Sequence, residues 1–383
     1  MSDQSRVVQT QKAGYRNSSL EMLRIVAMLI IIVHHFGVHG IFIGPLGTER
    51  TFGLFSWQVL FTQLVCWGGS LGNSLFVIIT GYFMVDREQR WKKLGMLLAT
   101  MFFYSWVIEA IVYGGGFLQP TGKSVLHMSI PILFGENWFI SCYLIFSLFI
   151  PFYNCLLNTM PKKMYEKFLL LLFFVVIVFP AAKFETFLHG NMAFFALVYA
   201  CGGYLKLYGS DLIEVRLREK YLRYFMALVV ITLATIVLQD ALAFLLHKER
   251  MIGSGGTKVA SLLYIPMAMS LFGYFLTRPD FYSPWVNKIA GTVPGIYLIH
   301  DNALMRELIW NHIFPNLDMI SSPWYVLFYG GKVLAVFAVC SGIDLMRKRW
   351  IEPVFDRKLD RWTFVIERRG QAMQEALSKY IFK

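Results

Sequence analysis

The sequence predicts an all-α protein, a polytopic membrane helix bundle with about ten transmembrane helices. Three observations lead to this fold class. Of the 383 residues, 56% are hydrophobic and only 16% are charged, whereas soluble domains average about 25% charged residues. Ten apolar stretches are candidates for membrane spans. The basic residues between these stretches fall mainly on one side of the predicted bundle.

The predicted spans cover residues 21–40, 68–85, 94–113, 137–157, 168–182, 190–208, 222–246, 258–277, 289–310 and 324–346. The fifth is short for a full crossing. Residues 53–67 are also apolar, and we interpret them as a re-entrant or interfacial segment in place of an eleventh span. The spans predict an N-terminal tail (1–20), a transmembrane domain (21–346) and a basic C-terminal tail (347–383), of which 364–382 could form an amphipathic surface helix.

Charge predicts the topology. With the N-terminus in the cytoplasm, 27 Lys and Arg fall on the cytoplasmic side and 8 on the outer side, where residues within the spans are counted with the nearer side and Arg24 is left out. This bias follows the positive-inside rule with both termini cytoplasmic. It also accounts for the net charge of +12, so we infer no nucleic-acid partner. The five scattered cysteines include no Cys-x-x-Cys pair and predict neither a disulfide framework nor a zinc site.

The first predicted span carries ionisable groups at defined helical positions. Glu21 and Arg24 are three residues apart and can pair. Eleven residues, almost three turns, separate Arg24 from His35, so the two lie on nearly the same face about 16 Å apart. Because ionisable groups inside a membrane are costly, they indicate function. The alternative is that Arg24 snorkels to the headgroups and His35 is only packed.

Two further histidines flank this pattern. His34 points about 80° away from the row that holds Arg24. His35 and His39 are four residues apart and could share a metal ion. Since no third ligand stands near them in the sequence, we expect no metal site.

A basic cluster follows the second predicted span. Arg87 and Arg90 are three residues apart and fall on one face of a helical turn. Their guanidinium groups are suited to bind phosphate oxygens. The alternative is an ordinary stop-transfer cluster of basic residues.

Five polar residues within or beside the apolar spans are candidates to line a cleft. They are Asn73, Thr80, Glu136, Tyr297 and His300. Pro294 and Gly295 can kink the ninth predicted span and open a cavity there. The alternative for each candidate is helix packing or a hydrogen bond between helices.

Four motifs occur in order along the chain: Leu20-Glu-Met-Leu-Arg24 with His35, Leu75-Phe-Val-Ile-Ile-Thr-Gly-Tyr-Phe83, Arg87-x-x-Arg90, and Tyr297-Leu-Ile-His300. Together they resemble the acyltransferase-3 family of integral membrane O-acyltransferases. The resemblance covers nearly the whole chain and corresponds to members without a fused esterase-like domain. Two positions depart conservatively from the family pattern, Glu21 where Asp is usual and Thr80 where Ser is usual.

The resemblance implies transfer of an acyl group, commonly acetyl, from cytoplasmic acyl-CoA to a hydroxyl of a cell-surface polysaccharide or lipid-linked sugar. It implies a bacterial inner (plasma) membrane protein in contact with membrane lipid. Acetyl-CoA would be a co-substrate, and no bound cofactor is expected. In this interpretation Arg87 and Arg90 hold the phosphates of CoA. Two other function classes stay open: a transporter of a small polar molecule, and a membrane sensor without catalysis.

The same resemblance leads to a mechanism. A hydroxyl needs a base at neutral pH, and histidine is the side chain suited to that task. We expect His35 to deprotonate the acceptor directly, or to accept the acyl group first. Arg24 would hold the donor or polarise its thioester carbonyl, and Glu21 would orient Arg24. His300 is expected to help in the same cleft.

Overall fold

The computed structural model describes residues 17–42, 56–182, 190–247, 258–314 and 316–361. Within these ranges the protein is all-α, as the sequence predicts. Seven stretches of the described chain are long and apolar enough to cross a membrane. They are Ser18–Phe42, Trp57–Met84, Trp91–Gly114, Trp138–Thr159, Lys162–Ala181, Val215–Leu245 and Tyr325–Trp350, and a shorter apolar helix covers Ala260–Leu276. The chain is therefore a polytopic membrane helix bundle.

Each predicted span corresponds to helix. The first six are α1 (Ser18–Gly37), α4 (Gly69–Met84), α5 (Trp91–Gly114), α8 (Trp138–Thr159), α9 (Lys162–Phe173) with η2 (Phe174–Val178) and α10 (Phe179–Ala181), and α11 (Asn191–Tyr208). The remaining helices of the bundle include α12 (Arg218–Leu245), α13 (Lys258–Leu276) and α18 (Tyr325–Trp350). Two short helices, α6 (Gly122–Ser129) and α7 (Pro131–Phe134), join α5 to α8.

The apolar stretch before the second predicted span contains helix α3 (Trp57–Cys66). A turn at Trp67 and Gly68 joins it to α4, and the two form one hydrophobic stretch. Both helices pack against α1. The part of the expected re-entrant segment before residue 56 lies outside the described residues.

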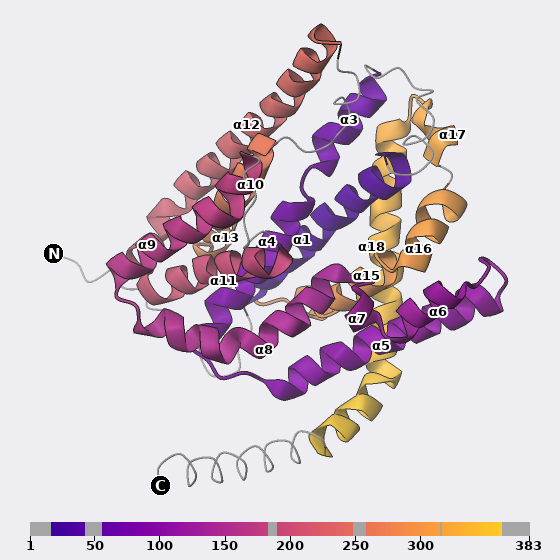
Figure 1. The fold of residues 1–383 in the computed structure, drawn as a ribbon, viewed down its shortest axis with the longest axis horizontal. Coiled ribbons are helices and arrows are strands. Elements are labelled where there is room, and N and C mark those ends of the chain that lie inside the picture. Colours follow the sequence, from indigo (N-terminus) through magenta and orange to yellow (C-terminus); the bar gives the residue numbers. More distant parts are fainter. Residues whose placement is uncertain (1–16, 43–55, 183–189, 248–257, 315, 362–383) are drawn as a thin grey trace.

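Helix α1 runs through the middle of the bundle (Figure 1). It contacts α3, α4, α13, α14 (Pro284–Ala290), α15 (Val293–His300) and α18. Its first turn is tied to distant segments. The Ser18 hydroxyl donates to Asn287 Oδ1 over 2.9 Å, and the Ser19 hydroxyl donates to the carbonyl of Phe275 over 3.0 Å. These bonds fix the start of α1, and so the depth of Glu21 and Arg24.

Small residues let α4 approach its neighbours closely. A Cβ on Gly81 would lie 2.1 Å from the carbonyl oxygen of Tyr199, and one on Gly202 would lie 2.2 Å from that of Ile78. These two glycines bring α4 and α11 into backbone contact. Gly72 similarly faces the carbonyl oxygen of Ala27 in α1. The small residues of the second predicted span therefore serve helix packing.

The ninth predicted span is broken rather than continuous. It contains α14, α15, α16 (Ala303–Glu307) and the π-helical turn η6 (Leu308–Ile313), and α17 (Asn316–Ile320) follows. A turn at Gly291 and Thr292 separates α14 from α15, and Pro294 lies in the first turn of α15. Gly295 packs against the carboxyl group of Asp344 in α18. The expected distortion at Pro294 and Gly295 thus takes the form of a short buried helix.

Helix α18 continues past the predicted start of the C-terminal tail. Arg347 is only 6% exposed, and its Nε donates to Asp344 Oδ1 over 2.7 Å. The hydroxyl of Tyr104 in α5 donates to the same oxygen over 2.8 Å. The position 346/347 therefore lies within a packed helix. The segment 364–382 lies outside the described residues.

Candidate functional site

Three of the cavities formed by the described residues adjoin one another along α1. We name them by their contents: the basic cavity, the central cavity and the histidine cavity. The basic cavity contains Arg24, Arg87 and Arg90, the central cavity contains Arg24 and Ile31, and the histidine cavity contains Ile31 and His35. Shared lining residues place the three in the order in which α1 passes them.

The basic cavity has a volume of about 590 Å³. Its walls carry the cationic side chains of Arg24, Arg87, Arg90 and Lys93. Arg87 and Arg90 are both exposed. They lie in the non-helical connection between α4 and α5, so the prediction that they share one face of a helical turn is wrong. The expected pair at its inner edge forms, because Arg24 Nη1 lies 2.6 Å from Glu21 Oε1. The cavity therefore carries two kinds of positive charge: Arg24, which is paired with Glu21, and the exposed Arg87 and Arg90.

Two asparagines of α8 fix the end of α4 that leads to Arg87. Asn154 Nδ2 donates to the carbonyl of Met84 over 2.7 Å, and Asn158 Nδ2 donates to that of Val85 over 2.8 Å. These carbonyls lie at the C-terminal end of α4, where carbonyl groups run out of helical partners. The Met84 carbonyl also accepts from the N–H of Arg87 over 3.2 Å. The asparagine bonds therefore determine where the Arg87 backbone leaves the bundle.

The central cavity has a volume of about 340 Å³ and is mainly apolar. It shares Arg24 and Thr80 with the basic cavity. The Thr80 hydroxyl donates to the carbonyl of Phe76 over 2.9 Å, within its own helix. Lys348 of α18 also lines this cavity, and nothing in the sequence marked it out from the basic residues around it.

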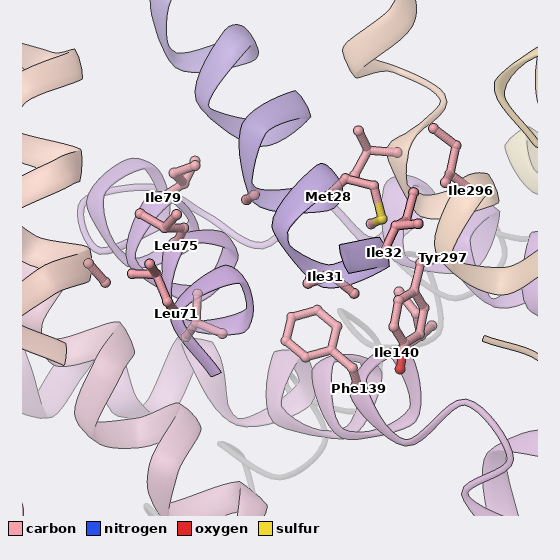
Figure 2. Close-up of a cluster of buried hydrophobic side chains, with 14 of the residues drawn as sticks. Met28, Ile31, Ile32, Leu71, Leu75, Ile79, Phe139, Ile140, Ile296 and Tyr297 are labelled. Atoms are coloured by element: carbon pink, nitrogen blue, oxygen red, sulfur yellow. The ribbon is translucent and has the colours of Figure 1, made fainter. Parts of the chain in front are cut away.

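Aromatic and aliphatic side chains enclose the inner end of the central cavity. Figure 2 shows Ile31 of α1 beside Phe139 of α8, with the ring of Tyr297 adjacent. The ring centroids of Phe139 and Tyr297 are 5.8 Å apart. All three side chains line the central cavity, and Ile31 is the residue that the central cavity shares with the histidine cavity.

The histidine cavity has a volume of about 590 Å³ and is lined by His34, His35, Ser70 and Asn73 among others. The predicted cleft residue Asn73 therefore lines the same cavity as His35. The His34 side chain has a different partner from that of His35, because its Nδ1 donates to the carbonyl of Cys66 over 2.5 Å. Its ring also packs on Gly69.

A polar cluster forms behind His35. His35 Nδ1 lies 3.0 Å from His300 Nε2 and 3.4 Å from Asp301 Oδ1. His300 Nδ1 lies 2.7 Å from the carbonyl oxygen of Ile296, one turn earlier in α15. Arg306 Nε lies 3.7 Å from Asp301 Oδ1. His300 and Asp301 are almost fully buried, so this cluster is a fixed part of the bundle.

A metal ion would find three of its usual ligands here. The ligating atoms of His35, His39 and Asp301 all lie within 4.8 Å of one another. The third ligand, which the sequence did not place near the histidines, comes from the end of α15. Arg306 already provides a positive charge beside that carboxylate, which disfavours a second cation by repulsion.

Two of the predicted cleft residues, His300 and Glu136, line none of the three cavities. His300 is fully buried beside His35, whereas Glu136 lies just before α8. Its Oε1 pairs with His127 Nδ1 at 2.7 Å. The His127 ring stacks on Phe134 in α7, with centroids 4.3 Å apart. Glu136 therefore orders the connection between α5 and α8.

These features define a multi-pass membrane protein with neighbouring cavities along α1, from a basic one lined by Arg87 and Arg90 to one lined by the buried His35. A family model described as an acyltransferase domain matches residues 17–342. The match covers most of the chain, which therefore belongs to the acyltransferase-3 family. No match is found among curated proteins or among solved structures.

Proposed function

We propose that the protein is an O-acyltransferase that moves an acetyl group from cytoplasmic acetyl-CoA to a hydroxyl of a cell-surface polysaccharide or lipid-linked sugar. One observation carries the proposal: the adjoining cavities that connect Arg87 and Arg90 with His35. In a bacterial inner membrane with both termini cytoplasmic, the basic cavity would open to the cytoplasm. The histidine cavity would then face the side where the glycan is.

The basic cavity suits the phosphates of CoA. Guanidinium groups bind phosphate oxygens through charge-assisted, bidentate hydrogen bonds. Arg87 and Arg90 are exposed and free to adjust to a flexible anion, and Arg24 lies deeper in the same cavity. The pantetheine arm would pass Arg24 and Thr80 into the central cavity, with Glu21 orienting Arg24.

The size and apolar lining of the central cavity suit a short acyl group. Its inner end is enclosed by Ile31, Phe139 and Tyr297, next to the histidine cavity (Figure 2). A thioester at this end would be close to an acceptor hydroxyl in the histidine cavity. Because apolar side chains surround it, water is kept from hydrolysing the thioester.

In the transfer step, His35 removes the proton of the acceptor hydroxyl, and the hydroxyl oxygen attacks the thioester carbonyl carbon. A C–O bond forms and the C–S bond breaks. The CoA thiolate leaves and takes up the proton from His35, which returns to its starting state. The products are an O-acetyl ester and CoA. Attack by His35 itself, through an acyl-histidine, gives the same products in two transfers.

The proposal is tested by mass spectrometry of surface glycans from cells with and without the gene. We expect ester-linked acetyl groups to disappear on deletion and to return with the intact gene, while the His35→Ala variant restores none. Unchanged glycan acetylation together with a lost solute uptake would replace the enzyme by a transporter. Unchanged acetylation and uptake would favour a sensor.

A further inference from the structure

We propose that His300 and Asp301 hold His35 in a single tautomer, with its proton on Nδ1 and its lone pair on Nε2. This makes His300 and Asp301 positioning residues for the base of the transfer reaction. The inference rests on the proposed function, in which His35 accepts the proton of the acceptor hydroxyl.

The tautomer of His300 follows from its hydrogen bond within α15. His300 Nδ1 lies 2.7 Å from the carbonyl oxygen of Ile296. A carbonyl oxygen only accepts hydrogen bonds, so Nδ1 carries a proton. His300 is fully buried, which favours the neutral ring. A neutral imidazole has one N–H, and His300 therefore offers the lone pair of Nε2.

The tautomer of His35 follows in turn. Within the described chain, its Nδ1 faces two hydrogen-bond acceptors: His300 Nε2 at 3.0 Å and Asp301 Oδ1 at 3.4 Å. Neither has a proton to give, so Nδ1 of His35 is the donor. The lone pair of His35 is then on Nε2. His35 lines the histidine cavity, and in our proposal Nε2 is the nitrogen that meets the acceptor hydroxyl there.

Asp301 contributes charge as well as geometry. When Nε2 takes up the hydroxyl proton, His35 becomes an imidazolium whose Nδ1–H remains directed at His300 and Asp301. The carboxylate of Asp301 is 1% exposed, so its attraction for this cation is little screened by water. Arg306 Nε lies 3.7 Å from the same carboxylate and places a positive charge beside it. The proton then leaves from Nε2 to the CoA thiolate, and the starting tautomer is restored.

The proposal is tested by comparing two substitutions of His300 in the purified full-length protein. His300→Gln keeps an acceptor for the Nδ1–H of His35, whereas His300→Leu removes it and keeps much of the volume. With [acetyl-¹⁴C]acetyl-CoA and surface glycan extracted from deletion cells, we expect His300→Leu to lower kcat by about 100-fold or more. His300→Gln should stay within about 10-fold of the wild type, because the orienting bond survives. The KM for acetyl-CoA should be unchanged in both.

Two further variants complete the comparison. Asp301→Asn retains the size of the side chain and removes its charge, so kcat should fall while His300→Gln remains active. His312, which is exposed and 3.6 Å from Glu307 at its Nε2, is the matched control, and His312→Leu should keep the wild-type kcat. All variants are compared at equal amounts of monodisperse protein.

Several outcomes overturn the proposal. A His300→Leu variant with wild-type kcat would mean that His35 needs no such orientation, and a His300→Gln variant as inactive as His300→Leu would deny the acceptor role. If His300→Leu fails to fold, the other two variants still decide. A wild-type kcat in Asp301→Asn together with an inactive His300→Gln would overturn the proposal. Activity that requires Zn²⁺ and is lost with a chelator would place a metal on Nδ1 instead. In all of these the wild type still transfers acetyl. If the wild type transfers no more acetyl than the His35→Ala variant, the proposed function is refuted together with the inference.

Discussion

The two ends of the chain of cavities are built in different ways. At the basic cavity, Arg87 and Arg90 are exposed side chains on a turn between two helices. At the histidine cavity, His35, His300 and Asp301 are buried, and His35 Nδ1 lies 3.0 Å from His300 Nε2 and 3.4 Å from Asp301 Oδ1. Charge attraction tolerates varied geometry, whereas proton transfer requires atoms at hydrogen-bond distance. This difference fits the proposed function, in which the basic end would capture the donor and the histidine end would carry out the transfer.

The largest effect is expected from His35→Ala. Without the base, transfer should fall by about 100-fold to 10,000-fold, while equilibrium binding of acetyl-CoA changes little because His35 lies outside the basic and central cavities. His34→Ala should be milder, since His34 bonds to the Cys66 carbonyl and not to His300. Transfer assays and isothermal calorimetry measure the two properties. An inactive His34→Ala beside an active His35→Ala would reverse the assignment.

The opposite pattern is expected at the basic end. Replacing Arg87 and Arg90 together by Ala should raise the Kd for acetyl-CoA by about 10- to 100-fold, because charge-assisted phosphate contacts are lost. At saturating donor, kcat should stay near that of the wild type. Lys162→Ala with Lys163→Ala removes two exposed charges at the start of α9 and is the control. Normal acetyl-CoA binding by the arginine double variant would leave these residues with a stop-transfer role only.

Gly81→Ala tests the packing that positions the basic end. A Cβ there would lie 2.1 Å from the Tyr199 carbonyl oxygen, so α4 and α11 must separate. We expect a loss of about 1–3 kcal/mol in stability, seen as a lower thermal unfolding temperature in detergent. Gly330→Ala, where nothing lies within 4 Å of an added Cβ, should not lower that temperature. Equal temperatures for both variants would contradict the close contact.

The smallest effect is expected from a substitution in the central cavity, which lies between the basic and histidine cavities. Phe139→Ala should enlarge the inner end of the central cavity and raise the use of butyryl-CoA relative to acetyl-CoA by about 10-fold, as pocket size governs discrimination by chain length. Phe152→Ala, on the same helix but 76% exposed, is the control. Relative kcat/KM for the two donors measures the effect. An unchanged preference would mean that Phe139 does not limit the acyl group.

Features that depend on local spacing could be predicted from the sequence. The helical spans follow from apolar runs, and the Glu21–Arg24 pair follows from its three-residue separation. The prediction also identified His35 and His300 individually. Their contact joins residues 265 apart, and it depends on the break of the ninth span into short helices, which periodicity does not reveal.

The surroundings of Arg347 and Arg306 could not be predicted from the sequence. Arg347 stands in a basic run typical of a cytoplasmic tail, yet its guanidinium bonds to Asp344 inside the bundle. Arg306 falls near the end of the ninth predicted span, where the sequence shows no partner for it, yet it lies beside Asp301. In both cases a carboxylate from the tertiary structure stabilises the charge, and a single sequence does not show such partners.

The claim that acetyl passes from the basic end to the His35 end is tested most directly in inverted membrane vesicles. [Acetyl-¹⁴C]acetyl-CoA is supplied outside, where the basic cavity would open, and the endogenous surface glycan is enclosed inside. We expect alkali-labile ¹⁴C-acetyl on the enclosed glycan in wild-type vesicles and none with His35→Ala. Wild-type vesicles that leave the enclosed glycan unlabelled, or that label it equally well with His35→Ala, would contradict this function.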